Sequence, residues 1–223
     1  MITMVERGAM RASTKPDAIR SAALRLFLGS GLRRTSMDAI AAEANVTKQT
    51  IYRYYGSKEQ LFVEVLGGMA AGARTDVLEV MPSAPVTRDQ LEKILLTTAQ
   101  RILDRILDPK YLDLVRILIA EARDFPELAR MFRAAAIEGV ADALAELLQS
   151  EHTAAVVRVP DIQPALRLFV GPLLFAELEA LLGDPAVVRQ RTQANLPAVI
   201  ELFVSAVSHP SRREEGEMEG EVS

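Results

Sequence analysis

The chain has no cysteine, no tryptophan and only two histidines among its 223 residues. Without cysteine it has no disulfide, no thiolate nucleophile and no zinc–thiolate site. His152 and His209 lie far apart in the sequence, which is a poor start for a metal site. No apolar run approaches the ~20 residues that a membrane-spanning helix needs, and the N-terminal stretch lacks the apolar core of a signal peptide. We therefore expect a cytoplasmic protein with no metal, no cofactor and no membrane partner.

The usual groupings of catalytic residues are also missing. The sequence offers no paired nucleophile and base, no glycine-rich phosphate loop and no cluster of metal ligands. An enzyme with a fused helical domain is therefore the weakest interpretation, and we expect a binding protein that is not an enzyme.

Charge is distributed unevenly along the chain, although its net charge is −4. Residues 1–60 hold ten Lys and Arg against five Asp and Glu, a net charge of +5, whereas the remainder is at −9. A basic N-terminal part joined to an acidic body indicates that only the first part meets phosphate. A chance fluctuation of surface charge is the alternative.

The stretch Ser36 to Tyr55, SMDAIAAEANVTKQTIYRYY, has the pattern of two short helices joined by a tight turn. Ser36 and Thr47 stand at the two N-cap positions. Asn45 stands at the turn, where it tolerates a left-handed conformation better than any residue except glycine. This is the helix-turn-helix pattern, which sets its second helix into a major groove.

Periodicity assigns two faces to this unit. An inward face holds the unit together and consists of Ile40, Ala44, Val46, Ile51 and Tyr55. The outward face of the second helix gathers donors that have no packing reason to be polar together, namely Lys48, Gln49, Tyr52 and Arg53.

The rest of the chain reads as helical, because no segment shows the period-two alternation of strands. One helix from Asp17 precedes the unit and is expected to stop at Gly29 and Gly31, and another runs from Ser57 to about Val80. Further helices are expected over about 87–107, 109–123, 126–149, 161–182 and 185–207. The sequence thus predicts an all-α protein of about nine helices.

Residues 17–66 resemble the DNA-binding domain of the TetR family of bacterial transcriptional repressors. The matching run is SMDAIAAEANVTKQTIYRYYGSKEQLFVEVL, in which several spaced elements agree. One position departs from the family: Gln49 stands where a small residue is common. The segment RILIAEARDFPELARMF, from Arg116 to Phe132, is similar to the regulatory domain of the AefR-like branch.

We expect four parts. Composition predicts a flexible arm over 1–14 and a disordered acidic tail over 209–223. Between them we expect a three-helix DNA-binding domain over 15–60 and a helical regulatory and dimerisation domain over 61–208, and the resemblance implies that the protein is a homodimeric repressor. Its partners would be a palindromic double-stranded DNA operator and a small, hydrophobic effector of unknown identity.

The expected DNA-binding residues divide by chemistry. Phosphates would be held by the hydroxyls and ammonium groups of Ser36, Thr47, Lys48, Tyr52 and Lys58. Gln49 can bond adenine in two places, Arg53 can do the same to guanine, and Thr50 offers a hydroxyl or a methyl group. Tyr54 is as consistent with helix packing as with DNA contact.

Two apolar stripes in the last two helices are expected to form a dimer interface, although each is equally consistent with intramolecular core. They comprise Leu166, Phe169, Val170, Leu173 and Leu174, followed by Leu196, Ile200, Phe203 and Val204. Candidate effector contacts, each also explicable as plain core, are Met69, Leu95, Ile102, Tyr111, Ile117, Phe132 and Phe175, with Arg116 or Glu121 as a polar anchor. A bend near Gly67 to Gly72 would spread the recognition helices on release.

A sequence-tolerant architectural DNA-binding protein is the main alternative. It keeps the basic domain but predicts no operator and no release by a small molecule. The base-competent face from Thr47 to Arg53 and the large body argue against it.

Overall fold

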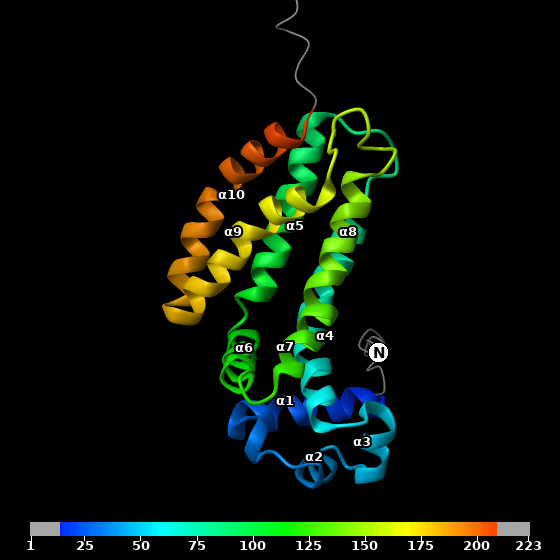
Figure 1. Ribbon diagram of the computed structural model, residues 1–223, viewed down its shortest axis with the longest axis vertical. Coiled ribbons are helices and arrows are strands. Elements are labelled where there is room, and N and C mark those ends of the chain that lie inside the picture. The colour runs from blue at the N-terminus through cyan, green and yellow to red at the C-terminus, as the bar shows by residue number, and fades with distance from the viewer. Residues whose placement is uncertain (1–13, 209–223) are drawn as a thin grey trace, which may run out of the picture. The chain divides into compact units, whose positions relative to one another are not determined.

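The computed structural model describes residues 14–208, without the side chains of 70, 71 and 135–137. The predicted tail and nearly all of the predicted arm lie outside this range. The described chain forms ten α-helices and one π-helical segment, η1 (Figure 1). Its helices are α1 (Lys15–Arg34), α2 (Met37–Glu43), α3 (Lys48–Tyr55), α4 (Lys58–Glu79), α5 (Arg88–Ile106), α6 (Pro109–Glu121), α7 (Pro126–Phe132), η1 (Arg133–Glu138), α8 (Gly139–Leu148), α9 (Ile162–Leu182) and α10 (Pro185–Val207).

The all-α fold predicted from the sequence is confirmed. Within residues 14–208 no β-strand forms, and Val157 and Ser208 make an isolated bridge. In the same range no helix combines the length and the apolar character needed to cross a membrane. The predicted N-caps Ser36 and Thr47 accept a hydrogen bond from the backbone of the first helical turn, and Thr87 does the same at the start of α5.

Two compact units divide the chain. Within the described range, the first comprises residues 14–69 and 113–135, and the second comprises 70–112 and 136–208. The divisions fall within α4, α6 and η1.

The first unit is built around the aromatic and branched side chains of α1 to α4. Phe27 of α1 and Phe62 of α4 meet edge to face with ring centroids 5.2 Å apart. Ile40 of α2 and Ile51 of α3 are fully buried. Asn45 has φ +52°, which confirms the predicted left-handed turn between α2 and α3.

The first helix is longer than the sequence predicted. Gly29 lies within α1 and does not end it, and the helix kinks at Gly31, where φ is +74°. Thr35 ties the turn after the kink back to α1, because its buried hydroxyl donates to the carbonyls of Leu26 and Gly31.

The second unit packs α10 against α5 and α9. Phe169 of α9 and Phe203 of α10 lie edge to face at 5.3 Å, and Leu95 of α5 is fully buried. The connection between α8 and α9 is anchored by Thr153, whose buried hydroxyl donates to the carbonyl of Leu147 over 3.0 Å. These contacts give the unit a core of its own.

Two glycine substitutions should distinguish a glycine that is needed for its left-handed backbone from a glycine that only weakens a helix. Gly56 closes α3 with φ +71°, and a Cβ there would collide with the Gln60 side chain. Gly56→Ala should therefore lower the free energy of unfolding by roughly 1–2 kcal/mol. Gly29 is helical with nothing near its Cβ position, so Gly29→Ala should raise it by up to about 1 kcal/mol. Urea unfolding followed by circular dichroism measures both, and equal signs would contradict this account.

Candidate nucleic-acid interface

The second helix of the helix-turn-helix unit exposes its polar face because its apolar face is fixed inside. Ile51 is fully buried, and Tyr55 is buried with its hydroxyl donating to the carbonyl of Pro16 over 3.2 Å. Burial raises the pKa of the Tyr55 phenol. With α3 anchored in this way, Gln49, Tyr52 and Arg53 are left exposed to solvent.

Two tyrosines of α3 have exposed side chains. Tyr52 and Tyr54 are each 45% exposed, which is unusual for a side chain whose role is packing. The Arg53 guanidinium lies 5.3 Å from the centroid of the Tyr54 ring. The N-cap hydroxyl of Thr47 lies 2.8 Å from that of Thr50.

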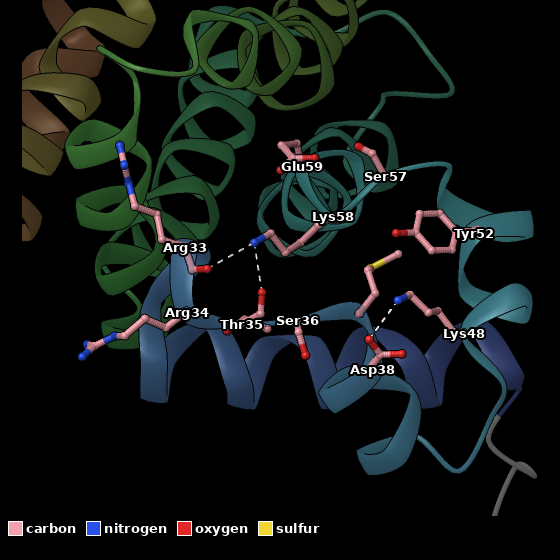
Figure 2. A pocket seen from close by; sticks show the side chains of 11 residues that line it. Arg33, Arg34, Thr35, Ser36, Asp38, Lys48, Tyr52, Ser57, Lys58 and Glu59 are labelled. Atoms are coloured by element: carbon pink, nitrogen blue, oxygen red, sulfur yellow. Dashed lines mark hydrogen bonds and ion pairs between the residues drawn. The ribbon is translucent and has the colours of Figure 1, made fainter.

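An open pocket of about 430 Å³ lies beside α3 (Figure 2). Its walls come from the end of α1, the start of α2, the outward side of α3 and the start of α4. It is lined by Arg33, Arg34, Thr35, Ser36, Met37, Asp38, Lys48, Tyr52, Ser57, Lys58 and Glu59. The structure thus brings together four of the predicted phosphate-binding residues, Ser36, Lys48, Tyr52 and Lys58.

The basic side chains of the pocket are held by specific partners. Lys58 donates to the carbonyls of Thr35 at 3.0 Å and Arg33 at 3.5 Å, as Figure 2 shows. Lys48 Nζ lies 2.8 Å from Asp38 Oδ2, and this contact raises the pKa of Lys48. Ser36 accepts from the backbone of Ala39, so its own O–H can still donate.

Arg33, at the wall of the pocket, contacts residues of the first unit that lie far away in the sequence. Its Nε donates to Glu121 Oε2 over 2.7 Å, a second nitrogen contacts Asp124, and the guanidinium lies 5.6 Å from the centroid of the Phe125 ring. These contacts raise the pKa of the Arg33 guanidinium.

Sequence reasoning missed the wall formed by Arg33, Arg34, Asp38 and Glu59. The doubled arginine shortly before the Ser36 N-cap, separated from it by Thr35, was the available signal. Asp38 is an acidic residue in the first turn of α2, where the helix dipole alone accounts for it. Its contact with Lys48 depends on how α2 and α3 fold together.

An exposed row of base-competent side chains beside a cation-lined pocket suits double-stranded DNA. Comparison with known proteins agrees with this chemistry. Residues 19–65 match the model of bacterial regulatory proteins of the tetR family, and residues 93–206 match the C-terminal domain of AefR-like transcriptional repressors. The chain belongs to the TetR family.

Curated relatives match parts of this chain. HTH-type transcriptional repressor SCO4008 of Streptomyces coelicolor is 32% identical over 120 residues, covering 51% of this chain and 55% of that protein. BetI of Rhizobium meliloti is 30% identical over 78 residues, covering 35% of this chain and 38% of that protein. The chain therefore spans about half or less of the length of the curated relatives that it matches.

Solved structures align over more of the chain. A TetR-family regulator from Mesorhizobium loti is 26% identical with a TM-score of 0.69, and the flavonoid-responsive regulator FrrA is 29% identical with a TM-score of 0.66. Each alignment covers 90% of this chain and all of the other chain.

Most of the residues predicted for dimerisation are buried within this TetR-family chain. The intramolecular alternative applies to seven of them, which are at most 6% exposed: Leu166, Phe169, Leu173, Leu196, Ile200, Phe203 and Val204. Val170 is half-buried and Leu174 is 43% exposed. The physical reason is that α9 is apolar on two faces, and the regular stripe read from the sequence is the one that packs inward.

The predicted effector contacts are dispersed. In the second unit Leu95, Ile102 and Tyr111 are buried, whereas Phe175 is 61% exposed and lines no interior site. In the first unit Met69, Ile117 and Phe132 are half-buried. Both proposed anchors are engaged: Arg116 with Asp113 at 2.7 Å and Glu121 with Arg33.

A half-buried carboxyl group that the sequence did not predict, that of Glu177, lies beside Tyr111. The Tyr111 hydroxyl bonds Glu177 of α9, and burial raises the pKa of Glu177 to about 7. The same burial raises the pKa of Tyr111. The second unit therefore contains a side chain whose charge changes near neutral pH.

Stability should depend on pH through this group. The folded protein retains a proton on Glu177 that the unfolded chain releases above about pH 4.5. The free energy of unfolding should thus fall as pH rises from about 4.5 to 7, by roughly 3 kcal/mol at most. In Glu177→Gln this part of the slope should vanish, and in the neighbouring Glu179→Gln it should remain. Urea titrations at half-unit pH steps test this, and identical slopes in all three proteins would refute it.

Proposed function

We propose that the protein is a ligand-responsive transcriptional regulator, a repressor that binds a palindromic DNA operator as a homodimer. The observation that carries the proposal is the pocket of Lys48, Tyr52 and Lys58 directly beside the exposed Gln49 and Arg53 of α3. Phosphate contacts at the pocket would fix the position of α3, and the two exposed side chains would read base edges. Family membership supports this division of roles.

The phosphate contacts combine a charge with directional donors. Tyr52 and Lys58 point into the pocket from α3 and α4 (Figure 2). A backbone phosphate there would meet the Tyr52 hydroxyl, the Lys58 ammonium and the Ser36 hydroxyl, with Lys48 nearby. Such contacts supply affinity and a steep salt dependence without sequence preference.

Base discrimination would come from Gln49 and Arg53. Gln pairs in bidentate fashion with adenine and Arg with guanine. The Thr50 hydroxyl is hydrogen-bonded to the hydroxyl of the Thr47 N-cap. The methyl group of Thr50 therefore remains for a contact with thymine. Gln49 and Arg53 have no place in the fold's core, which favours an operator reader over an architectural binder.

A second copy of the chain is the proposed partner for α9 and α10. The outward side of α9 carries apolar side chains spaced seven, three and four residues apart, as in a helix-packing seam. They are Leu168, Phe175, Leu178 and Leu182, and the last is 83% exposed. On α10, Val187 and Leu202 are exposed in the same way. A two-fold axis would bury this face against its own copy and predicts a roughly palindromic operator.

The effector is proposed to be a small hydrophobic molecule bound in the regulatory part of the chain. FrrA, 29% identical, is described as flavonoid-responsive, which supports control by a small molecule. Such a ligand releases DNA only if it binds the released conformation more tightly than the DNA-bound one. Glycines 67, 68 and 72 within α4 remain the proposed place of bending.

Footprinting on the protein's own upstream region tests the function. Wild type should protect one short palindrome. Tyr52→Phe should weaken binding to every duplex and leave the salt slope unchanged, because the lost hydroxyl is a neutral donor to phosphate. Arg53→Ala should instead relax selectivity at one base pair, by roughly 1–3 kcal/mol. Equal protection of all DNA by wild type would support the architectural alternative and sink the repressor.

Sedimentation velocity tests the homodimer. Phe175→Glu places a charge in the proposed seam on both copies and should shift the protein to monomer at micromolar concentration. Ile119→Glu is a matched control, because Ile119 is 59% exposed on a different helix, and it should remain dimeric. A monomeric wild type, or two variants that behave alike, would contradict the proposed interface.

A further inference from the structure

One carboxylate stands inside the proposed phosphate pocket. Asp38, in the first turn of α2, reaches across the helix-turn-helix unit to Lys48, the first residue of α3. The Asp38 Oδ2 to Lys48 Nζ distance is 2.8 Å, and the two side chains are 71% and 48% exposed. Figure 2 shows the pair at the rim of the pocket, beside Tyr52.

The pairing of Lys48 differs from that of the other pocket cations. Lys58 and Arg34 donate to neutral backbone carbonyls. Arg33 is paired with Glu121 and Asp124, neither of which lines the pocket. The carboxylate that holds Lys48 is itself a pocket residue, so its charge lies where a phosphate would bind.

Fold stability gives little reason for this pair. Ion pairs between exposed side chains stabilise proteins only slightly and are screened by salt. A phosphate entering the pocket would have to share or replace Asp38 at the Lys48 ammonium, and any sharing would place two anions side by side. The pair therefore matters mainly for what else binds Lys48.

We propose that Asp38 limits the affinity of the protein for duplex DNA by competing with a backbone phosphate for the Lys48 ammonium. The inference rests on the proposed DNA-binding function and adds an opposing residue to it. A limited affinity for DNA has a use. An effector can weaken DNA binding only by the factor by which it binds the released conformation more tightly than the DNA-bound one. Asp38 would keep binding within that range.

A double-mutant cycle tests the competition. The probes are two labelled duplexes of equal length, one from the protein's own upstream region and one with its sequence scrambled. Asp38→Asn should tighten binding to both by about three- to tenfold at 0.1 M salt and steepen the salt slope by about 1. The gain should disappear in the Lys48→Met background, because the competition acts through that ammonium.

Glu59→Gln is the matched control. Glu59 is a second carboxylate of the pocket, on α4, and its removal should give no gain that depends on Lys48. Weaker binding by Asp38→Asn, with an unchanged melting curve, would show that Asp38 orients Lys48 and would overturn the inference. An equal gain with and without Lys48 would overturn it too, in favour of a general field effect.

The same measurements separate this inference from the proposed function. Phosphate competition acts on both duplexes, so a wild type that binds them equally well would sink the operator-reading function and leave the cycle decisive for Asp38. A wild type that binds neither duplex would overturn both.

Discussion

The corner after α1 is the constraint that positions the pocket proposed to bind phosphate. Its geometry starts from Gly31, whose positive φ turns the chain, and from Thr35, whose buried hydroxyl ties the turn back to α1. The carbonyls of Arg33 and Thr35 then receive the Lys58 ammonium from α4. One corner thereby fixes the ends of α1 and α4 and delivers Ser36 to cap α2. The cations around the pocket depend on this corner for their spacing.

In the proposed function, recognition and stability use different sides of the same short helix. In α3 the buried Ile51 and Tyr55 hold the helix in the unit, and the exposed Gln49 and Arg53 take no part in that packing. Substitutions on the exposed side can therefore alter what is bound with little cost to folding. This separation explains how one helix-turn-helix scaffold can accommodate different base-reading residues.

Local chemistry predicted more of the DNA-binding unit than of the body. The caps at Ser36 and Thr47 and the left-handed Asn45 follow from properties of single residues, so the sequence located both helices. The faces of α9 depend on which neighbours pack against them, and an apolar helix with two stripes does not reveal which one turns inward. Arg33 with Glu121, and Tyr111 with Glu177, are pairs far apart in the sequence. No short-range pattern predicts them.

In helix α4 a residue of low helix propensity, Gly72, makes room for a specific ion pair. Gly72 weakens the helix, yet a Cβ at this position would collide with the guanidinium of Arg105. The vacant space lets Arg105 bond both carboxylate oxygens of the buried Asp76, at 2.5 and 3.1 Å. The C-terminal half of α4 is thus fastened to α5 in the second unit, while Phe62 in its N-terminal half packs on Phe27 in the first. Gly67 and Gly68 lie between these two contacts, and their low helix propensity supports the proposal that α4 bends there.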